Sequence, residues 1–241
     1  MKTLVAGASG ATGKHLVEQL LQMGQQVKVI VRPSAKIINE WNNNEAVTII
    51  RASISEMTAD EIAVYTEDCQ AIACCLGHNL TVKGLFGKPR KLVANAVELL
   101  CNAVEQNSPE NSVKFVLMSS VAVRYKDLGE RVSLGQKITM SIIRLLAPPH
   151  RDNEKASDYL RFTIGQKNAK IQWAAVRPDS LINENHVTEY QLYASPTKSL
   201  FNPGKTSRIN VGNFMARLIV ENDLWEEWKG KMPAIYNKEN D

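Results

Sequence analysis

The sequence predicts an α/β protein with a doubly wound, mostly parallel sheet and helices on both of its faces. Two observations support this fold class. Short apolar runs alternate along the chain with longer segments whose apolar residues recur at helical spacing. The short runs are also apolar throughout, which is typical of parallel strands covered on both faces. A length of 241 residues fits a single domain, 1–241.

The first unit along the chain is a strand, a glycine-rich turn, a helix and a second strand. The strands are expected over Thr3–Ala6 and Val27–Val31. Between them, apolar residues at helical spacing predict a helix from about Thr12 to Met23, and Gly24 ends it. A β-α-β unit of this size is typical of one half of a nucleotide-binding fold.

The same alternation predicts the remaining elements. Thr58 and Glu61 have the spacing of a capping box at the start of a short helix, and Asn210 is a candidate cap for a late helix. Trp225 and Trp228 are expected to be buried by packing. The last third of the domain, about 179–241, is more irregular and is expected to complete the site. Further strands are expected at Val47–Ile50, Ala71–Leu76, Val113–Met118, Ile171–Val176 and Pro233–Tyr236, and further helices at Pro89–Glu105, Asn153–Thr163 and Val211–Glu221.

Composition limits the classes of partner. Apolar residues make up 44% of the chain and charged residues 22%, and the net charge is only +4, so we expect no nucleic-acid surface. No apolar run approaches the roughly 20 residues that span a bilayer, and the chain enters a strand pattern directly after Met1-Lys2. We therefore expect a cytoplasmic monomer or homodimer that acts on a small-molecule substrate without a membrane.

The four cysteines, Cys69, Cys74, Cys75 and Cys101, have no metal-ligand spacing. Cys74 and Cys75 are adjacent in an apolar run, so on a strand they point to opposite faces. We expect all four to be small buried apolar residues, and we expect no metal site.

The glycine-rich turn predicts a Rossmann-type dinucleotide site. It has the sequence Gly7-Ala8-Ser9-Gly10-Ala11-Thr12-Gly13, and its position between a strand and a helix makes the motif specific. Gly7 permits the tight turn, Gly10 lets the backbone approach a pyrophosphate, and Gly13 lets the helix pack on the strand. Backbone N–H groups around Ala11 would meet the pyrophosphate, and the hydroxyls of Ser9 and Thr12 add donors. The alternative is a glycine-rich turn without a ligand.

The end of the second strand distinguishes two cofactors. NAD-selective sites place an acidic residue there, whereas this chain has Arg32, Ser34 and Lys36 and no acid within the segment. A guanidinium can bind a 2′-phosphate through two charge-assisted hydrogen bonds. We therefore expect NADP(H) in preference to NAD(H). The alternative is that this segment is only a solvated basic turn.

These residues resemble the atypical short-chain dehydrogenase/reductase proteins of the NmrA-like and biliverdin reductase B-like kind. Three further stretches agree, Leu76-Gly77-His78-Asn79, Met118-Ser119-Ser120 and Val176-Arg177-Pro178. The resemblance covers most of the chain. It is specific for the fold and the dinucleotide but not for one reaction, because that family contains both reductases and NADP-sensing regulators.

The resemblance also implies roles for individual residues. Leu76 and Gly77 would pass beside the adenosine and its ribose. Ser119 and Ser120 lie where related dehydrogenases keep the serine that binds a substrate carbonyl. Lys155 falls where their lysine contacts the nicotinamide ribose, and Pro178 would flank the nicotinamide. At the adenine, where an acidic residue often follows the third strand, this chain has Ala52 and Ser53.

One departure concerns the proton donor. The superfamily motif is Tyr-x-x-x-Lys, but the residue four before Lys155 is Arg151. A proton would then come from solvent, or from His150 or Tyr125 if a loop closes over the site. His150 is equally compatible with a solvent-exposed loop.

The basic segment Val121–His150 is a candidate lid. Met140, Ile143 and Leu146 would form its apolar wall, or would pack as the buried stripe of a surface helix.

Two functions remain. The first is an NADPH-dependent reductase of a small conjugated or carbonyl acceptor of the quinone, flavin or enone type, because such acceptors delocalise charge and need a strong acid less. The alternative is a non-catalytic NADP(H) sensor. A sugar-nucleotide epimerase or dehydratase is disfavoured because it would need the tyrosine.

Overall fold

A computed structural model describes residues 1–78, 90–125, 129, 148–199 and 201–238. The strands are β1 Lys2–Ala6, β2 Gln26–Val31, β3 Val47–Arg51, β4 Ala71–Cys74, β5 Val113–Met118, β6 Ile171–Pro178, β7 Ser180–Ile182, β8 Tyr190–Tyr193, β9 Lys205–Ser207 and β10 Ala234–Asn237. The α-helices are α1 Gly13–Gln22, α2 Asn39–Asn42, α3 Ala59–Thr66, α5 Leu92–Asn107, α7 Pro148–Asp158, α8 Arg208–Val220 and α9 Asn222–Trp228. A 3-10 turn, η1, covers Ile54–Glu56, and a π-helical turn, η3, covers Tyr159–Ile164.

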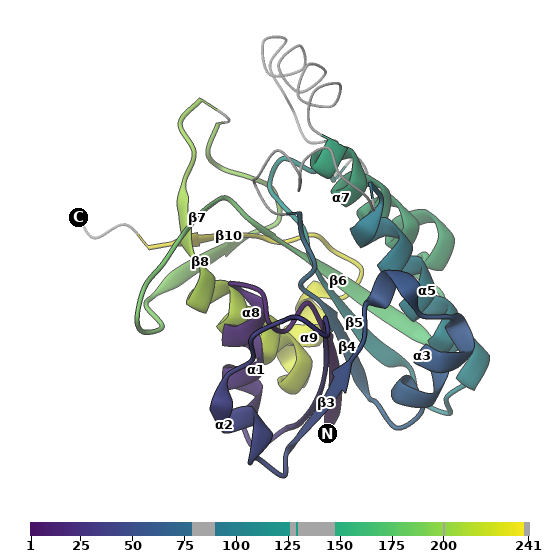
Figure 1. The fold of residues 1–241 in the computed structure, drawn as a ribbon. Coiled ribbons are helices and arrows are strands. Elements are labelled where there is room, and N and C mark those ends of the chain that lie inside the picture. The colour runs from purple at the N-terminus through teal and green to yellow at the C-terminus, as the bar shows by residue number, and fades with distance from the viewer. Residues whose placement is uncertain (79–89, 126–128, 130–147, 200, 239–241) are drawn as a thin grey trace.

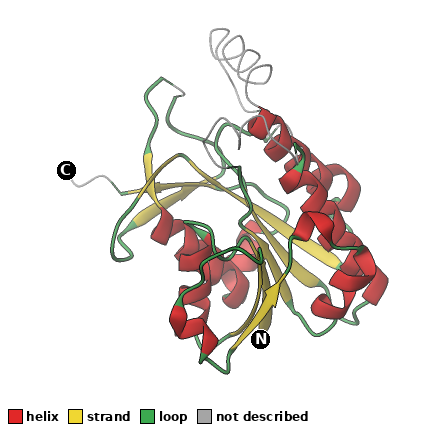
Figure 2. Ribbon diagram, in the orientation of Figure 1, coloured by secondary structure: helices red, strands yellow, loops and turns green. Residues whose placement is uncertain are grey.

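The predicted fold class is confirmed. Eight strands form one sheet in the order β3-β2-β1-β4-β5-β6-β10-β8, and every neighbouring pair is parallel except β10 with β8. A second small sheet pairs β7 with β9. Helices α3, α5 and α7 cover one face of the large sheet, and α1, α8 and α9 cover the other (Figures 1 and 2). The apolar strands therefore lie between two helical layers, as their composition predicts.

Both helical layers bury apolar side chains against the sheet. On one face Leu100 and Phe115 belong to one cluster, and on the other Leu16, Val29 and Phe214 belong to a second. The strands supply the two clusters alternately, because successive side chains point to opposite faces. Trp225 and Trp228 are buried in the second cluster, as expected.

Helices α1 and α8 approach each other very closely. Gly212 of α8 lies so near α1 that a Cβ atom there would be 2.8 Å from the backbone nitrogen of Leu16. Backbone atoms cannot move aside as a flexible side chain can, so this contact requires glycine. It fixes the position of α1, whose N-terminus follows the glycine-rich turn.

Helix starts are stabilised locally, with one difference from the expectation. Thr58 and Glu61 form the predicted capping box at α3. At α8 the cap is Ser207, whose Oγ accepts a hydrogen bond from the N–H of Asn210 at 3.2 Å. The prediction that Asn210 caps this helix is wrong. Its amide is buried and bonds Thr188 and Asn237 instead.

The helix before β6 begins earlier than predicted. The expected range was Asn153–Thr163, whereas α7 begins at Pro148 and continues into the π-helical turn η3. Proline is favoured in a first helical turn because its missing N–H would have no helical partner there. The predicted start of the preceding helix at Pro89 lies outside the described residues, and the described helix α5 begins at Leu92.

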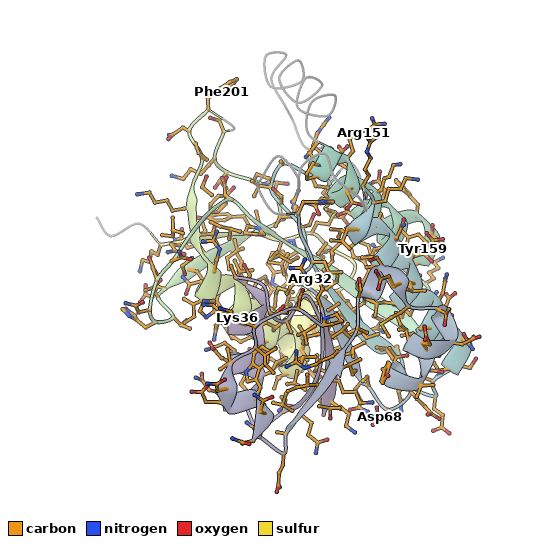
Figure 3. The ribbon with its side chains drawn as sticks, in the orientation of Figure 1. Arg32, Lys36, Asp68, Arg151, Tyr159 and Phe201 are labelled. Carbon is orange, nitrogen blue, oxygen red and sulfur yellow. The ribbon has the colours of Figure 1, made fainter. Side chains whose placement is uncertain are left out.

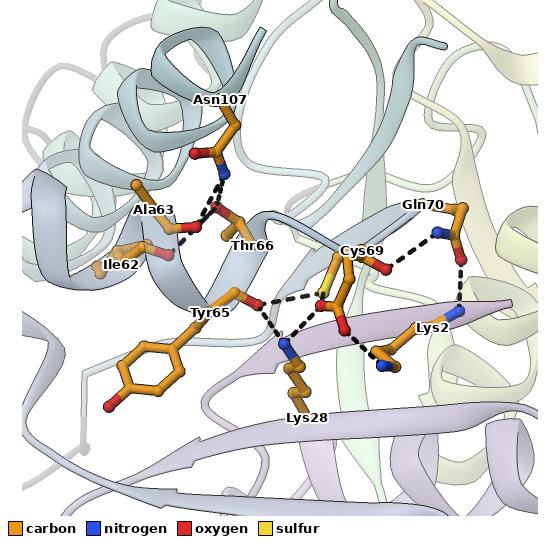
Figure 4. A network of polar contacts seen from close by, with 10 residues as sticks. Lys2, Lys28, Ile62, Ala63, Tyr65, Thr66, Cys69, Gln70 and Asn107 are labelled. Carbon is orange, nitrogen blue, oxygen red and sulfur yellow. Dashed lines mark hydrogen bonds and ion pairs between the residues drawn. The ribbon is translucent and has the colours of Figure 1, made fainter. Parts of the chain in front are cut away.

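A polar cluster lies at the amino ends of β1 and β2, opposite the glycine-rich turn (Figure 4). The carboxylate of Asp68 accepts hydrogen bonds from Lys2 and from Lys28, the latter at 2.5 Å. Burial raises the pKa of Asp68, but the two lysines outweigh this effect and lower it to about 2. Figure 3 shows Asp68 and Arg32 toward opposite ends of the sheet.

The four cysteines are buried and free, as predicted. Burial raises the pKa of Cys69 and Cys74 to about 12, so their thiols stay protonated at neutral pH. Among the described residues, no group of three or more His, Cys, Asp or Glu side chains is placed to hold a metal ion. The described helices are all too short or too polar to cross a membrane.

Candidate functional site

The strand order reverses between β1 and β4. From β1 the chain builds β2 and β3 on one side, then crosses to begin β4 on the other. Ala6 at the end of β1 is in register with Cys74 at the end of β4. In open parallel sheets, ligands bind beyond the carboxyl ends of the strands at such a switch point. The glycine-rich turn and Leu76-Gly77-His78 both leave the sheet there.

Two glycines of the turn are required by the protein itself. Gly7 has a φ of +80°, and a Cβ on it would lie 2.7 Å from the backbone of Cys75. A Cβ on Gly13 would lie 2.2 Å from the carbonyl oxygen of Gly7. These contacts confirm that Gly7 makes the tight turn and that Gly13 lets α1 pack against it.

Gly10 is different. A Cβ there would meet only the Gly7 oxygen, at 3.1 Å, and its φ is not positive. That oxygen belongs to the backbone, so the turn would have to shift by a few tenths of an ångström to take a side chain, which is a smaller demand than at Gly7 or Gly13. That Gly10 lets the backbone approach a pyrophosphate stays a prediction.

Two backbone donors precede α1, at the exposed Ala11 and at the buried Thr12. In the described part of the chain, no acceptor takes the N–H of Ala11 or Thr12, whereas the N–H of Gly10 is used within the turn. Ser9, Gly10 and Ala11 are exposed, and the first turn of α1 has no acidic residue. Thr12 precedes the helix, but its hydroxyl makes no capping bond. Free N–H groups and the positive end of the helix dipole together favour an anion.

The segment after β2 is basic and accessible. Arg32, Ser34 and Lys36 are exposed, and none of the ion pairs found among the described residues uses Arg32 or Lys36. Figure 3 shows that both side chains reach the surface. Within the described ranges, the two cations at the end of β2 therefore have no ion-pair partner, and their role toward a 2′-phosphate stays a prediction.

The structure adds a third cation, which the sequence analysis missed. Arg51 ends β3, where it is in register with Val31 of β2. One of its guanidinium nitrogens lies 3.5 Å from the carbonyl oxygen of Pro33. The register of parallel strands, which is not visible in the sequence, brings Arg51 to this segment. Ser53 follows, half-buried, and its hydroxyl lies 3.0 Å from that of Ser55.

Leu76 and Gly77 lie at the switch point, and their place beside the adenosine and its ribose stays a prediction. The turn at Gly7 packs against the backbone at Cys75 and Leu76, and Gly77 is exposed with open space beside it. Strand β4 ends at Cys74, two residues before the predicted end. The backbone at Leu76 and Gly77 is therefore free of the sheet and accessible from the glycine-rich turn.

Ser119 lies at the carboxyl end of β5 and contacts α7. It is 7% exposed, its N–H donates to the carbonyl of Val176, and its Oγ lies 3.0 Å from the Oγ of Ser157. Ser120 has a different role, because its Oγ accepts the N–H of Ala122 and so shapes the turn that follows. Of the two predicted serines, Ser119 faces α7.

Lys155 does not share that contact. Residues two apart on an α-helix point in nearly opposite directions, so Lys155 lies away from the face on which Ser157 meets Ser119. Lys155 is exposed, as is Arg151, which projects outward from α7 in Figure 3. The structure thus brings Ser157, which the sequence analysis did not single out, to the position beside Ser119.

The two proposed proton donors also differ from expectation. Tyr125 is buried and donates its hydroxyl hydrogen to the carbonyl of Gly230 at 2.8 Å, so it is committed to a structural bond. His150 is not in an exposed loop: it is 8% exposed in the first turn of α7, with Nε2 3.6 Å from a carboxylate oxygen of Glu154. Most of the candidate lid lies outside the described residues. The part left out is 126–128 and 130–147, which includes Met140, Ile143 and Leu146.

Asp152 joins three elements beside the switch point. Its carboxylate accepts hydrogen bonds from the N–H of Val93 at 2.8 Å and of Ala94 at 3.0 Å, at the start of α5. One of its oxygens also lies 2.7 Å from Nε2 of His78. The Asp152 side chain is fully buried. This residue on α7 therefore caps another helix and holds the segment after β4.

Pro178 ends β6 next to Ser119 and Ser120. Its carbonyl accepts the N–H of Val121 at 3.1 Å. The neighbouring Arg177 is fully buried, and its guanidinium donates to the carbonyls of Val123, Ala194 and Met232. Arg177 therefore fixes the segment after β5 against β6 and β8, and with it the backbone around Pro178.

The arrangement, with free helix N–H groups at a glycine-rich turn and a switch point beside it, is typical of a dinucleotide-binding fold. The sequence matches the NAD(P)H-binding family over residues 7–222. The chain belongs to this family. The match covers the glycine-rich turn, the strand ends and all of α8, so the resemblance to atypical short-chain dehydrogenase/reductase proteins is confirmed.

Known proteins of similar sequence or fold are consistent with this family assignment. An uncharacterised chloroplastic protein of Arabidopsis thaliana is 29% identical over 234 residues, which cover 97% of this chain and 76% of the relative. A short-chain dehydrogenase/reductase of Veillonella parvula in complex with NADP has a TM-score of 0.70 at 16% identity, covering 98% of this chain and 94% of its own. A putative NADH-flavin reductase of Streptococcus pneumoniae has a TM-score of 0.67 at 19% identity, covering 99% and 100%. The chain has an NAD(P)H-binding, oxidoreductase-like fold.

Proposed function

We propose that this protein is an NADPH-dependent reductase of a small conjugated acceptor of the flavin, quinone or enone type. The observation that carries the proposal is the set of free N–H groups at Ala11 and Thr12, placed beside a segment whose Arg32 and Lys36 have no anionic partner among the described residues. The first group fits a pyrophosphate and the second fits a 2′-phosphate.

The protein's own residues would bind and orient the two reactants. The glycine-rich turn and the basic segment after β2 hold the dinucleotide along the carboxyl edge of the sheet. Bound NADPH supplies a hydride. Ser119, at the end of β5, would offer its hydroxyl to a carbonyl oxygen of the acceptor, and Pro178 would flank the nicotinamide, as the family resemblance implies.

A conjugated acceptor is compatible with a site in which the described residues offer no tyrosine as proton donor. In the described residues, no tyrosine hydroxyl is free beside Ser119, since Tyr125 bonds Gly230. An acceptor that delocalises the developing charge can take its proton from solvent, which makes a strong local acid less important. The fold shared with a putative NADH-flavin reductase is consistent with this class of acceptor.

The test is NADPH oxidation, followed at the absorbance of the reduced nicotinamide, against quinones, flavins, enones and aldehydes. We expect saturable turnover with a conjugated class, little with simple aldehydes, and a lower Kd for NADPH than for NADH. Turnover only with aldehydes would refute the acceptor class, and equal Kd values would refute the cofactor preference.

A non-catalytic NADP(H) sensor is the second candidate. The observation that favours it is the engagement of the Ser119 hydroxyl with Ser157 at 3.0 Å, which leaves this group already bonded within the protein. Tight NADPH binding with no turnover across the panel would support the sensor and refute the reductase.

A further inference from the structure

We propose that Arg51, at the end of β3, forms a two-arginine site with Arg32 that binds the 2′-phosphate of the dinucleotide and so determines the preference for NADP(H). This inference deepens the proposed function and rests on its cofactor assignment. It names a second specificity residue, which lies 19 positions after Arg32 in the sequence but on the neighbouring strand in space.

The strand register places Arg51 beside the segment that carries Arg32. β2 and β3 stay paired to their ends, with Val31 opposite Arg51, and the ladder extends one residue further through the N–H of Ala52 to the carbonyl of Val31 at 3.0 Å. Neighbouring strands lie about 4.8 Å apart. The backbones that carry the two arginines are therefore fixed next to each other before any ligand binds.

The guanidinium of Arg51 already lies over the segment where the phosphate would bind. Among the described residues it makes one long hydrogen bond, at 3.5 Å to the carbonyl of Pro33, the residue that follows Arg32. A guanidinium has five N–H donors, so most of them remain available. Arg51 is exposed, as are Arg32 and Lys36, so an incoming phosphate can reach all three.

The charges around Arg51 are unbalanced. Arg32, Lys36 and Arg51 are absent from the ion pairs formed within the described ranges. Neighbouring like charges repel one another, and an anion between them removes that repulsion. A phosphate that accepts bidentate bonds from one arginine can accept further bonds from a second. NADH, which has a hydroxyl in place of the phosphate, gains nothing from this pair.

The test compares Kd values for NADPH and NADH in the wild-type protein and in Arg51→Ala, Arg51→Lys and Arg32→Ala. We expect Arg51→Ala to raise the NADPH Kd about tenfold and to change the NADH Kd less than about twofold, because one charge-assisted contact is lost. Arg51→Lys should recover part of the loss. Arg151→Ala is the matched control, since it removes one exposed arginine on the outer side of α7 and should change neither Kd.

A second measurement uses 2′,5′-ADP and 5′-AMP, which lack the nicotinamide and report on this end of the site without turnover. Arg51→Ala should weaken the binding of 2′,5′-ADP but not that of 5′-AMP. The loss of affinity should be larger at low salt. If Arg32→Ala selectively weakens NADPH binding but Arg51→Ala leaves it unchanged, Arg51 is no part of the site and the inference is overturned. If the wild-type protein itself does not prefer NADPH, the cofactor assignment fails first, and the inference fails with it.

Discussion

The carboxylate of Asp152, on α7, lies 2.7 Å from Nε2 of His78, in the segment that leaves β4. The same carboxylate caps the N-terminus of α5 through two backbone N–H groups, and both side chains are buried. Because those N–H groups can only donate, the carboxylate acts as acceptor toward them, and an Nε2–H of His78 completes its bonding. One residue thus couples the helix pair α5–α7 to the carboxyl edge of the sheet.

Replacing Asp152 should destabilise the fold. In Asp152→Ala, two N–H groups of α5 and the imidazole of His78 lose their partner in a buried place, which we expect to cost about 2–3 kcal/mol of unfolding free energy. Asp152→Asn keeps one acceptor oxygen and should cost less. Urea unfolding followed by circular dichroism measures both losses.

The matched control is Asp60→Ala. Asp60 is an exposed aspartate in the first turn of α3, and its carboxylate accepts an exposed hydrogen bond from Gln106 at 2.9 Å. We expect a smaller loss of stability than for Asp152→Ala. Equal losses of unfolding free energy in the two alanine variants would show that the Asp152 cap on α5 stabilises the fold no more than an ordinary surface contact does.

Gly10 and Gly13 should separate binding from folding. Gly10→Ala places a Cβ 3.1 Å from one backbone carbonyl oxygen, so the protein should fold with a smaller loss of stability than Gly13→Ala, yet the methyl group would occupy the place of the pyrophosphate. Gly13→Ala places its Cβ 2.2 Å from that oxygen and should cost about 1–3 kcal/mol of stability. NADPH titration and thermal unfolding of both variants check this pair. Unchanged NADPH affinity in a folded Gly10→Ala would remove the turn from the site.

The sequence predicted the parts of this site that are local. The turn from Gly7 to Gly13 could be recognised because each glycine acts on its own neighbours in the chain, and its place between a strand and a helix identified the motif. The strand ends at Ser119 and Pro178 followed from the same alternation. In a parallel sheet all carboxyl ends meet at one edge, so the order of elements alone brings these residues together.

The rest depends on contacts between distant segments. Arg51 reaches the segment after β2 only through the register of two strands, and Asp152 caps a helix that begins 60 residues earlier. Lys155 was assigned its role from the family resemblance, but the direction of a helical side chain depends on which face of α7 packs on the sheet. Residues two apart face opposite ways, so Ser157 instead meets Ser119.

Serine and lysine variants test which face of α7 matters for turnover. If the proposed function holds, Ser119→Ala should lower kcat/KM for the acceptor about tenfold, because one hydrogen bond to the reacting carbonyl is lost. Lys155→Ala should change the NADPH Kd less than about twofold, since the side chain is exposed on the other side of the helix. A tenfold weaker Kd in Lys155→Ala would instead place that lysine on the nicotinamide ribose, as the family resemblance implies.

Asp68 should contribute a pH-dependent part of the stability. Lys2 and Lys28 lower its pKa in the folded protein to about 2, below its ordinary value of 3.8. A lowered folded-state pKa means that the unfolded chain takes up the proton first as the pH falls. The stabilisation is therefore complete above the unfolded pKa and is lost as the pH falls through about 2.

The variant Asp68→Asn isolates this contribution. The carboxylate is partly exposed, so solvent screens it, and we expect a loss of only about 0.5 kcal/mol at pH 7. The difference between the wild-type protein and the variant should shrink steadily between pH 4 and pH 2, about the interval between the two pKa values. Urea unfolding at pH 7, 4 and 2.5 measures it. A difference that stays constant over this interval would show that the lysines do not act on the charge of Asp68, and that the variant loses only neutral hydrogen bonds.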